Sequence, residues 1–148
     1  MLTPTQTQTL RAAVDRLIPP DVSPEGPWPG GWDAGVGEYL SRLLTAEPRF
    51  LFTYARGLDG LDAEARAAPG GGAPGGDGSA FAALGPDAQD ALLARVEAGD
   101  VATDWPTPPA GFFRLLCQQA MEGFYADPGN GGNRGGVAWR MIGFQVTA

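Results

Sequence analysis

The chain has 148 residues, a formal net charge of −7, 23 glycines and 14 prolines. This length fits a single domain over 1–148 that buries about two thirds of its unfolded surface. An acidic chain without a basic cluster argues against nucleic acid as a partner and against an anionic membrane surface. No apolar stretch reaches the roughly 18 residues that span a bilayer, so no direct membrane insertion is expected.

Three helices are predicted in the first half of the chain. Thr3 followed by Pro4 is typical of a helix start, and apolar residues recur at helical spacing from there to the two prolines at 19 and 20. After a Pro/Gly loop, Asp33 is expected to cap a second helix. Pro48 is expected to open a third helix that ends near Ala67. The apolar residues expected on the buried sides of these helices are Leu10, Val14, Leu17, Ile18, Val36, Tyr39, Leu40, Leu43, Leu44, Phe50, Leu51, Tyr54, Leu58 and Leu61.

The second half begins with a low-complexity Gly/Pro-rich stretch at about 68–79, which is predicted to be a flexible insertion within one domain. Pro86 is expected to open a fourth helix that Gly99 ends, and a Pro-rich approach leads to the most apolar helix, 110–125. Only 137–141 alternates like a strand, and it is too short to carry a sheet. The predicted fold class is therefore all-α: an irregular bundle of about five helices with long Gly/Pro-rich loops and a C-terminal Gly-rich segment.

The residue types leave little catalytic chemistry. The chain has no histidine, no lysine and one cysteine, Cys117, which removes the commonest general base, a Schiff-base amine, haem and iron–sulfur ligation, and any intrachain disulfide. Two carboxylate pairs sit three residues apart. Asp59 and Asp62 are interpreted as a solvated helix face, and Asp87, which precedes Asp90, as a first-turn residue that the helix dipole favours. We expect no catalytic, cofactor-binding or metal-binding residue in this chain.

The stretch DPGNGGNRGGVAWRMIGF, residues 127–144, is the most informative part of the chain. Such a run is predicted to be a fixed loop, because glycine permits a positive φ and close backbone approach, and Asn133 tolerates a left-handed conformation. The loop is expected to deliver Trp139, Met141 and Phe144 into a packed environment. Glu122 or Asp127 is expected to order it by pairing with Arg134 or Arg140.

Two readings stay open for the glycines and for the tryptophans. The run 129–136 follows a helix, which does not fit a dinucleotide fingerprint, and an anion nest with Arg134 is the lesser alternative to a structural turn. Trp28, Trp32 and Trp105 lie in Pro-rich loops and are expected either to cover the bundle or to form an interface patch. Trp139 with Arg134 and Arg140 is either an interface cluster or part of the core.

The sequences GFYADP at 123–128 and GGNRGGVAWRMIGF at 131–144 resemble the C-terminal signature of the gluconate 2-dehydrogenase subunit 3 family. Members of this family are small subunits of membrane-associated, flavin-dependent sugar and sugar-acid dehydrogenases. The opening LTPTQTQTLRAAVDRLIPPD and the stretch 81–99 are similar to the family more loosely. Family members usually carry tyrosine where this chain has Asn130.

This resemblance implies a non-catalytic accessory subunit that binds and stabilises, and can help export, a large FAD-dependent dehydrogenase of the glucose-methanol-choline type. The FAD would lie in that partner, and a cytochrome subunit is a further candidate partner. The residues expected in the signature loop or at the partner interface are Tyr125, Asp127, Asn130, Gly131, Gly132, Asn133, Arg134, Trp139 and Arg140. The alternatives are a self-associating structural or small-ligand-binding helical module without a flavoprotein, and a stand-alone enzyme that uses carboxylates.

The cellular location is left open by the sequence. Members of the family commonly carry an export signal of the twin-arginine type, whereas this N-terminus shows neither that motif nor the apolar segment of a signal peptide. A leader missing from this sequence, a cytoplasmic location and export on a partner are all compatible with it.

Overall fold

A computed structural model describes residues 1–21, 27–68 and 78–143. Most of the predicted insertion at 68–79 lies outside the described residues, as does Phe144. At the end of that predicted stretch, Ser79 is a buried residue that caps a helix.

The described residues contain seven α-helices, which confirms the all-α class. They are α1 (Pro4–Leu17), α2 (Gly37–Ala46), α3 (Pro48–Ala67), α4 (Ala80–Ala83), α5 (Pro86–Ala98), α6 (Pro109–Tyr125) and α7 (Val137–Met141). Three short helical turns join them: η1 (Trp32–Val36), η2 (Pro128–Asn130) and η3 (Arg134–Gly136). The two helices beyond the expected five are the short α4 and α7. The alternating residues at 137–141 therefore form a helix.

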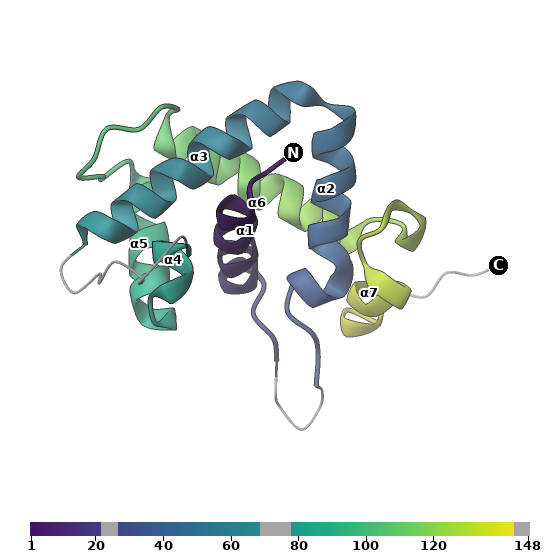
Figure 1. Ribbon diagram of the computed structural model, residues 1–148. Helices are drawn as coiled ribbons and strands as arrows, with labels where there is room; N and C mark the ends of the chain where they lie inside the picture. The colour runs from purple at the N-terminus through teal and green to yellow at the C-terminus, as the bar shows by residue number, and fades with distance from the viewer. Residues whose placement is uncertain (22–26, 69–77, 144–148) are drawn as a thin grey trace.

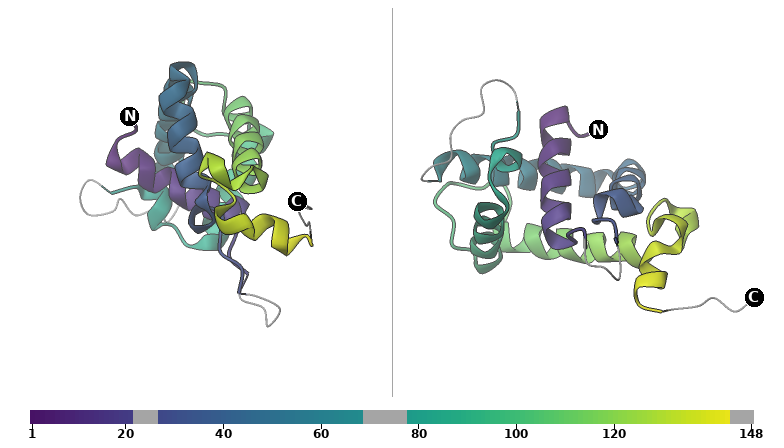
Figure 2. Two further views of the ribbon diagram at one scale, coloured as in Figure 1. Left: turned by 90° about the vertical axis from the view of Figure 1, so that its right-hand side faces the viewer. Right: turned by 90° about the horizontal axis from the view of Figure 1, so that it is seen from below.

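Two long helices, α3 and α6, run across the whole molecule, and α1 packs against α3 (Figure 1). Helices α4 and α5 lie at one end of the molecule, where α5 contacts α6 and α4 contacts both α1 and α3. Helix α2, η1 and α7 lie at the opposite end, beside the C-terminal end of α6 (Figure 2). The Gly-rich segment is therefore placed at the end of the bundle where the first and last thirds of the chain meet.

Local signals set most of the helix boundaries. The Thr3 hydroxyl accepts from the Gln6 backbone while the Gln6 side chain accepts from the Thr3 backbone, so α1 starts at a complete capping box. Gly99 ends α5 in the left-handed conformation, as predicted. The predicted cap at Asp33 is wrong, because Gly31 is the N-cap and Asp33 lies within the first turn. The turn starts early because its hydrogen bond runs from the Val36 N–H to the Gly31 carbonyl, which is wider than an α-helical turn.

The core is one cluster of apolar side chains from all of the long helices. At its centre the rings of Tyr54 on α3 and Phe112 on α6 meet edge to face, 5.9 Å apart. The buried Tyr54 hydroxyl donates to Gln119 at 2.7 Å. Gly57 allows the close contact between these helices, because a Cβ at this position would overlap the Phe112 ring.

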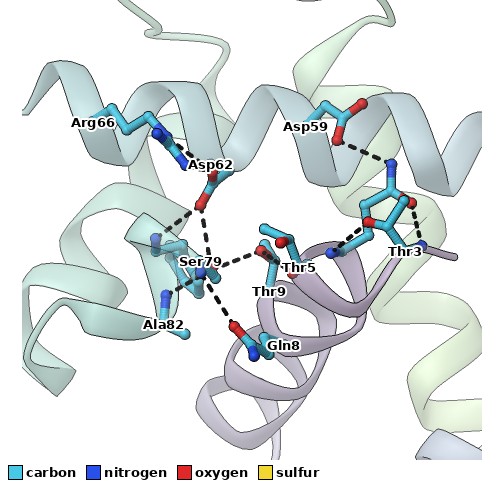
Figure 3. Close-up of polar contacts among 11 residues, drawn as sticks. Thr3, Thr5, Gln8, Thr9, Asp59, Asp62, Arg66, Ser79 and Ala82 are labelled. Atoms are coloured by element: carbon cyan, nitrogen blue, oxygen red, sulfur yellow. Dashed lines mark hydrogen bonds and ion pairs between the residues drawn. The ribbon is translucent and has the colours of Figure 1, made fainter. Parts of the chain in front are cut away.

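Asp62 is buried, 9% exposed, so its interpretation as part of a solvated face is wrong. Figure 3 shows its carboxylate between α3 and the start of α4, where it accepts from the Ser79 hydroxyl at 3.3 Å and the Phe81 N–H at 3.2 Å. Ser79 also contacts the Thr9 hydroxyl at 2.7 Å, and Arg66 pairs with Asp62 at 3.0 Å. Asp62 is buried because α4, which follows 69–77, packs its N-terminus over this turn of α3.

Glu64 anchors the connection between α5 and α6 in the same way. Its carboxylate accepts from the Ala102 N–H, from the Thr103 N–H and hydroxyl, and from the Trp105 indole at 3.2 Å. Trp105 packs against the core, as do Trp28 and Trp32. The prediction that these tryptophan loops cover the bundle is therefore confirmed.

Candidate functional site

The signature loop, residues 126–136, folds back over the end of α6. The Asp127 side chain accepts from the Gly129 N–H at 2.9 Å and starts η2. Positive φ angles follow at Gly131 (92°) and Asn133 (45°), and again at Gly135 and Gly136. The prediction that the loop contains left-handed residues is confirmed.

Asn133 holds this loop together from inside. Its side chain is fully buried, donates to the Ala126 carbonyl at 2.9 Å and accepts from the Ala138 N–H at 2.7 Å. These two hydrogen bonds connect the exit of α6 to the first turn of α7. A left-handed residue with an amide side chain satisfies both backbone groups at once.

Glycine is required where the loop backbone touches its neighbours. A Cβ at Gly132 would overlap the carbonyl oxygen of Gly123 in α6, and a Cβ at Gly35 would overlap the carbonyl oxygen of Gly131. Three backbone segments, from η1, the loop and α6, are thus in direct contact. Close backbone packing explains Gly132, and positive φ angles explain the glycines at 131, 135 and 136.

The charged residues pair differently from the prediction. Arg134 lies 3.7 Å from Glu38 of α2 and donates to the Asp33 carbonyl at 3.3 Å, so its expected pairing with Glu122 or Asp127 is wrong. Arg42 pairs with the same Glu38 carboxylate at 2.6 Å. The left-handed turns before Arg134 direct the chain toward η1 and α2 and away from α6.

The predicted site residues divide into a buried and an exposed group. Gly132 and Asn133 are buried, Gly131 is half-buried, and all three belong to the loop's own packing. Trp139 is also half-buried, and its indole donates to the Tyr125 carbonyl at 3.1 Å. The exposed group comprises Tyr125, Asp127, Asn130, Arg134 and Arg140. These five exposed residues are the members of the predicted set that a partner can reach.

Arg134 and Arg140 line one hollow of about 280 Å³, which we call the arginine hollow. Its other walls come from the segment before α2, more than a hundred residues earlier in the chain. The full lining is Pro27, Trp28, Pro29, Asp33, Ala34, Arg134, Val137 and Arg140. The sequence predicted Arg134 and Arg140 but missed Asp33, Glu38 and Arg42 as their neighbours, because no local signal connects η1 and α2 with the last thirty residues.

A family model described as gluconate 2-dehydrogenase subunit 3 matches residues 4–145 of the 148-residue chain. The chain belongs to this family. No curated protein and no solved structure gives a significant match. The resemblance seen in the signature is therefore confirmed and extends over almost the entire sequence. Its description makes the subunit 3 family a family of dehydrogenase-complex subunits.

A second and larger groove of this subunit 3 protein has no ionisable side chain in its lining. It measures about 570 Å³ and lies between α1, α2 and the start of α3. Its lining consists of Met1, Leu2, Thr7, Leu10, Trp32, Gly37, Ser41, Leu44, Thr45, Pro48 and Leu51. The lining side chains include none of the usual general acids or bases.

The perturbed ionisable groups of this subunit 3 protein have structural tasks. Burial raises the pKa of Asp15, whose carboxylate accepts from the Trp32 N–H at 3.2 Å. Burial also raises the pKa of the Cys117 thiol, which disfavours the nucleophilic thiolate. Across the residues described, no group of three potential ligands is arranged to hold a metal ion. Within the same ranges, no helix has the length and apolar character needed to cross a membrane.

Proposed function

We propose that this chain is a non-catalytic accessory subunit that binds and stabilises a large FAD-dependent dehydrogenase of the glucose-methanol-choline type, which oxidises sugars or sugar acids. The observation that carries the proposal is the match of residues 4–145 to a family described as a dehydrogenase subunit. Hydride transfer and FAD are assigned to the large subunit in this proposal. A role in the export of that subunit stays a prediction.

The chemistry of the chain supports this division of labour. The sequence has neither histidine nor lysine, and the carboxylates that the fold buries, Asp62 and Glu64, are used to hold backbone N–H groups. The buried residues of the signature loop pack within the protein, whereas Arg134 in the loop and Tyr125 at the end of α6 are exposed. Aromatic and arginine side chains on a rigid support are typical of protein interfaces.

Stabilisation of the large subunit follows from linkage. A subunit that binds only the folded form of its partner raises the partner's free energy of unfolding. The increase is about 2.7 kcal/mol when the free subunit is at one hundred times the Kd. The accessory subunit then raises the amount of active enzyme without contacting the substrate.

The test is co-expression with a candidate FAD-dependent large subunit from the same genome, followed by affinity purification through a tag on this chain. We expect co-elution at fixed stoichiometry, a flavin band in the visible spectrum, and a higher melting temperature of the large subunit in the complex. Expression of the large subunit alone is the control. If it is equally stable and active alone and does not co-elute, the proposal fails and the self-associating module is favoured.

A further inference from the structure

We propose that the arginine hollow receives the carboxylate of an aspartate or glutamate side chain on the surface of the large flavoprotein subunit. This inference rests on the proposed function and specifies which part of this chain recognises the partner. Residues of η1 and α7 line the hollow. Helix α7 lies at the end of the bundle that carries the signature loop (Figure 1).

The lining of the hollow has a positive excess on a chain whose net charge is −7. Arg134 and Arg140 are its two positive side chains, and Asp33 is its one carboxylate. A group that enters the hollow is therefore selected for negative charge.

Arg140 is the group that leaves this positive charge uncompensated. Glu38 already binds Arg42 at 2.6 Å and lies 3.7 Å from Arg134. Arg140 donates to the carbonyl oxygen of Gly135 and has no carboxylate partner among the residues that the structure describes. Its remaining N–H groups are available, and a guanidinium binds a carboxylate with two parallel hydrogen bonds.

The size and walls of the hollow favour a side chain over a small-molecule ligand. Its volume of about 280 Å³ is below the range of about 300–1,000 Å³ that is typical of ligand pockets. Trp28 and the prolines on either side of it provide an apolar wall on which the methylene groups of an acidic residue can pack. One carboxylate side chain satisfies the arginines and covers this wall.

Both arginines belong to backbone segments that are held by hydrogen bonds, so binding at the hollow is expected to lose little conformational entropy. Arg134 is held by the Asp33 carbonyl at 3.3 Å and follows the buried Asn133. Arg140 belongs to α7, whose first turn is fixed to the same Asn133. A preorganised pair of donors loses less side-chain freedom on binding than a flexible one.

The test compares charge variants of Arg140 in the complex of this chain with the large subunit. Arg140→Gln removes the charge, and Arg140→Glu reverses it. Arg114→Glu on the first half of α6 is the matched control, because Arg114 is also exposed but does not line the hollow. Circular dichroism and the melting temperature of each isolated variant establish that it is folded. The Kd for the large subunit is then measured at low and at high salt.

We expect Arg140→Gln to weaken binding about tenfold and Arg140→Glu to weaken it further, while Arg114→Glu changes the Kd less than about twofold. The losses should shrink at high salt, because screening weakens an exposed charge pair. A lysine or arginine that replaces one acidic residue on the large subunit should restore binding to Arg140→Glu.

Four outcomes overturn the inference. Equal binding of folded Arg140→Glu and wild type would reject the arginine hollow while leaving the accessory function in place. Equal losses for Arg114→Glu and Arg140→Glu would indicate only a general charge effect. Binding of free acetate that depends on Arg140, together with unchanged binding of the large subunit, would assign the hollow to a small carboxylate. Failure of the wild-type chain to bind the large subunit rejects the proposed function and this inference together.

Discussion

Asn133 joins three parts of the chain through one buried amide. It takes a left-handed conformation at the centre of the loop, closes the exit of α6 through the Ala126 carbonyl, and opens α7 through the Ala138 N–H. A buried backbone N–H without a partner costs about 1–3 kcal/mol of stability. The main contribution of the Asn133 amide is therefore that it gives buried backbone groups a hydrogen-bond partner. The loop thus depends on this residue at two levels, backbone conformation and hydrogen bonding.

Asn133→Ala is expected to lower the free energy of unfolding by about 2–4 kcal/mol, because it loses both hydrogen bonds and alanine tolerates the left-handed conformation less well than asparagine. Asn133→Gly loses the same hydrogen bonds without the backbone strain and should cost about 1 kcal/mol less. Urea denaturation of the isolated chain measures both. Alanine and glycine variants as stable as the wild type would show that the amide does not hold the loop.

The contribution of Glu64 to the stability of the fold is expected to depend on pH. Burial opposes ionisation of its carboxylate, but the hydrogen bonds from Thr103, Ala102 and Trp105 outweigh it and lower the pKa below its ordinary value of 4.5. A carboxylate whose pKa is lower in the folded state stabilises the protein above the unfolded pKa. That contribution is lost as the pH falls from about 4.5 through the folded pKa.

Glu64→Gln should therefore cost about 1–3 kcal/mol at about pH 7 and progressively less as the pH falls toward about 3. Glu97→Gln on the exposed side of α5 is the control, with little expected change at either pH. Denaturation curves across this pH range provide the measurement. A cost of Glu64→Gln that does not change with pH would contradict the stabilising role of the charge.

At the scale of elements, α3 and α6 approach each other where small residues face large rings. Gly57 lies against Phe112, and Gly60 lies against Trp105, with 2.5 Å between a Cβ built at Gly60 and the indole. A glycine inside a helix lowers helix stability by about 0.5–1 kcal/mol relative to alanine. The gain that offsets this cost is burial of the aromatic rings between the two helices.

Gly57→Ala is expected to destabilise the protein by about 1–3 kcal/mol, because the added methyl group overlaps the Phe112 ring and forces α3 and α6 apart. Gly111→Ala in α6 has the opposite expected sign, a gain of about 0.5 kcal/mol, since the nearest atom to a new Cβ is 3.7 Å away on Pro108. Urea denaturation of each variant measures the change in its free energy of unfolding. Stabilisation by Gly57→Ala would show that the contact of these helices is looser than described.

At the scale of the whole molecule, the net negative charge makes copies of this chain repel one another. The net charge is −7 at neutral pH and the isoelectric point is about 4.4. When this repulsion is removed, copies are expected to contact each other through exposed apolar side chains. These include Phe52 on α3 and Ile142 after α7.

Light scattering of the isolated chain should therefore rise as the pH approaches about 4.4 and stay low at about pH 7–8, because association increases as net charge approaches zero. Circular dichroism at each pH establishes that the protein is still folded. A defined dimer at about pH 7 whose amount does not depend on pH would instead favour the self-associating module.

The sequence alone was sufficient at several positions where the constraint is local, although the predicted cap at Asp33 was wrong. The helix starts at Thr3, Pro48 and Pro86 and the left-handed end at Gly99 follow from backbone geometry within a few residues, and all are found in the structure. The family was likewise recognisable from the order of glycine, asparagine and aromatic residues near the C-terminus. Helix spacing also identified the buried faces, since an apolar stripe can only be satisfied by burial.

The tertiary structure decided everything that depends on which distant segments meet. Asp62 was predicted to be a surface residue, but α4 packs over it. Arg134 lies near Glu38 on α2 and not near the carboxylates close to it in sequence. The arginine hollow exists only because the Asp33 carbonyl and the Arg134 guanidinium meet across 101 positions of the chain. Helical periodicity determines which face of an element is buried, but it carries no information about which partner covers that face.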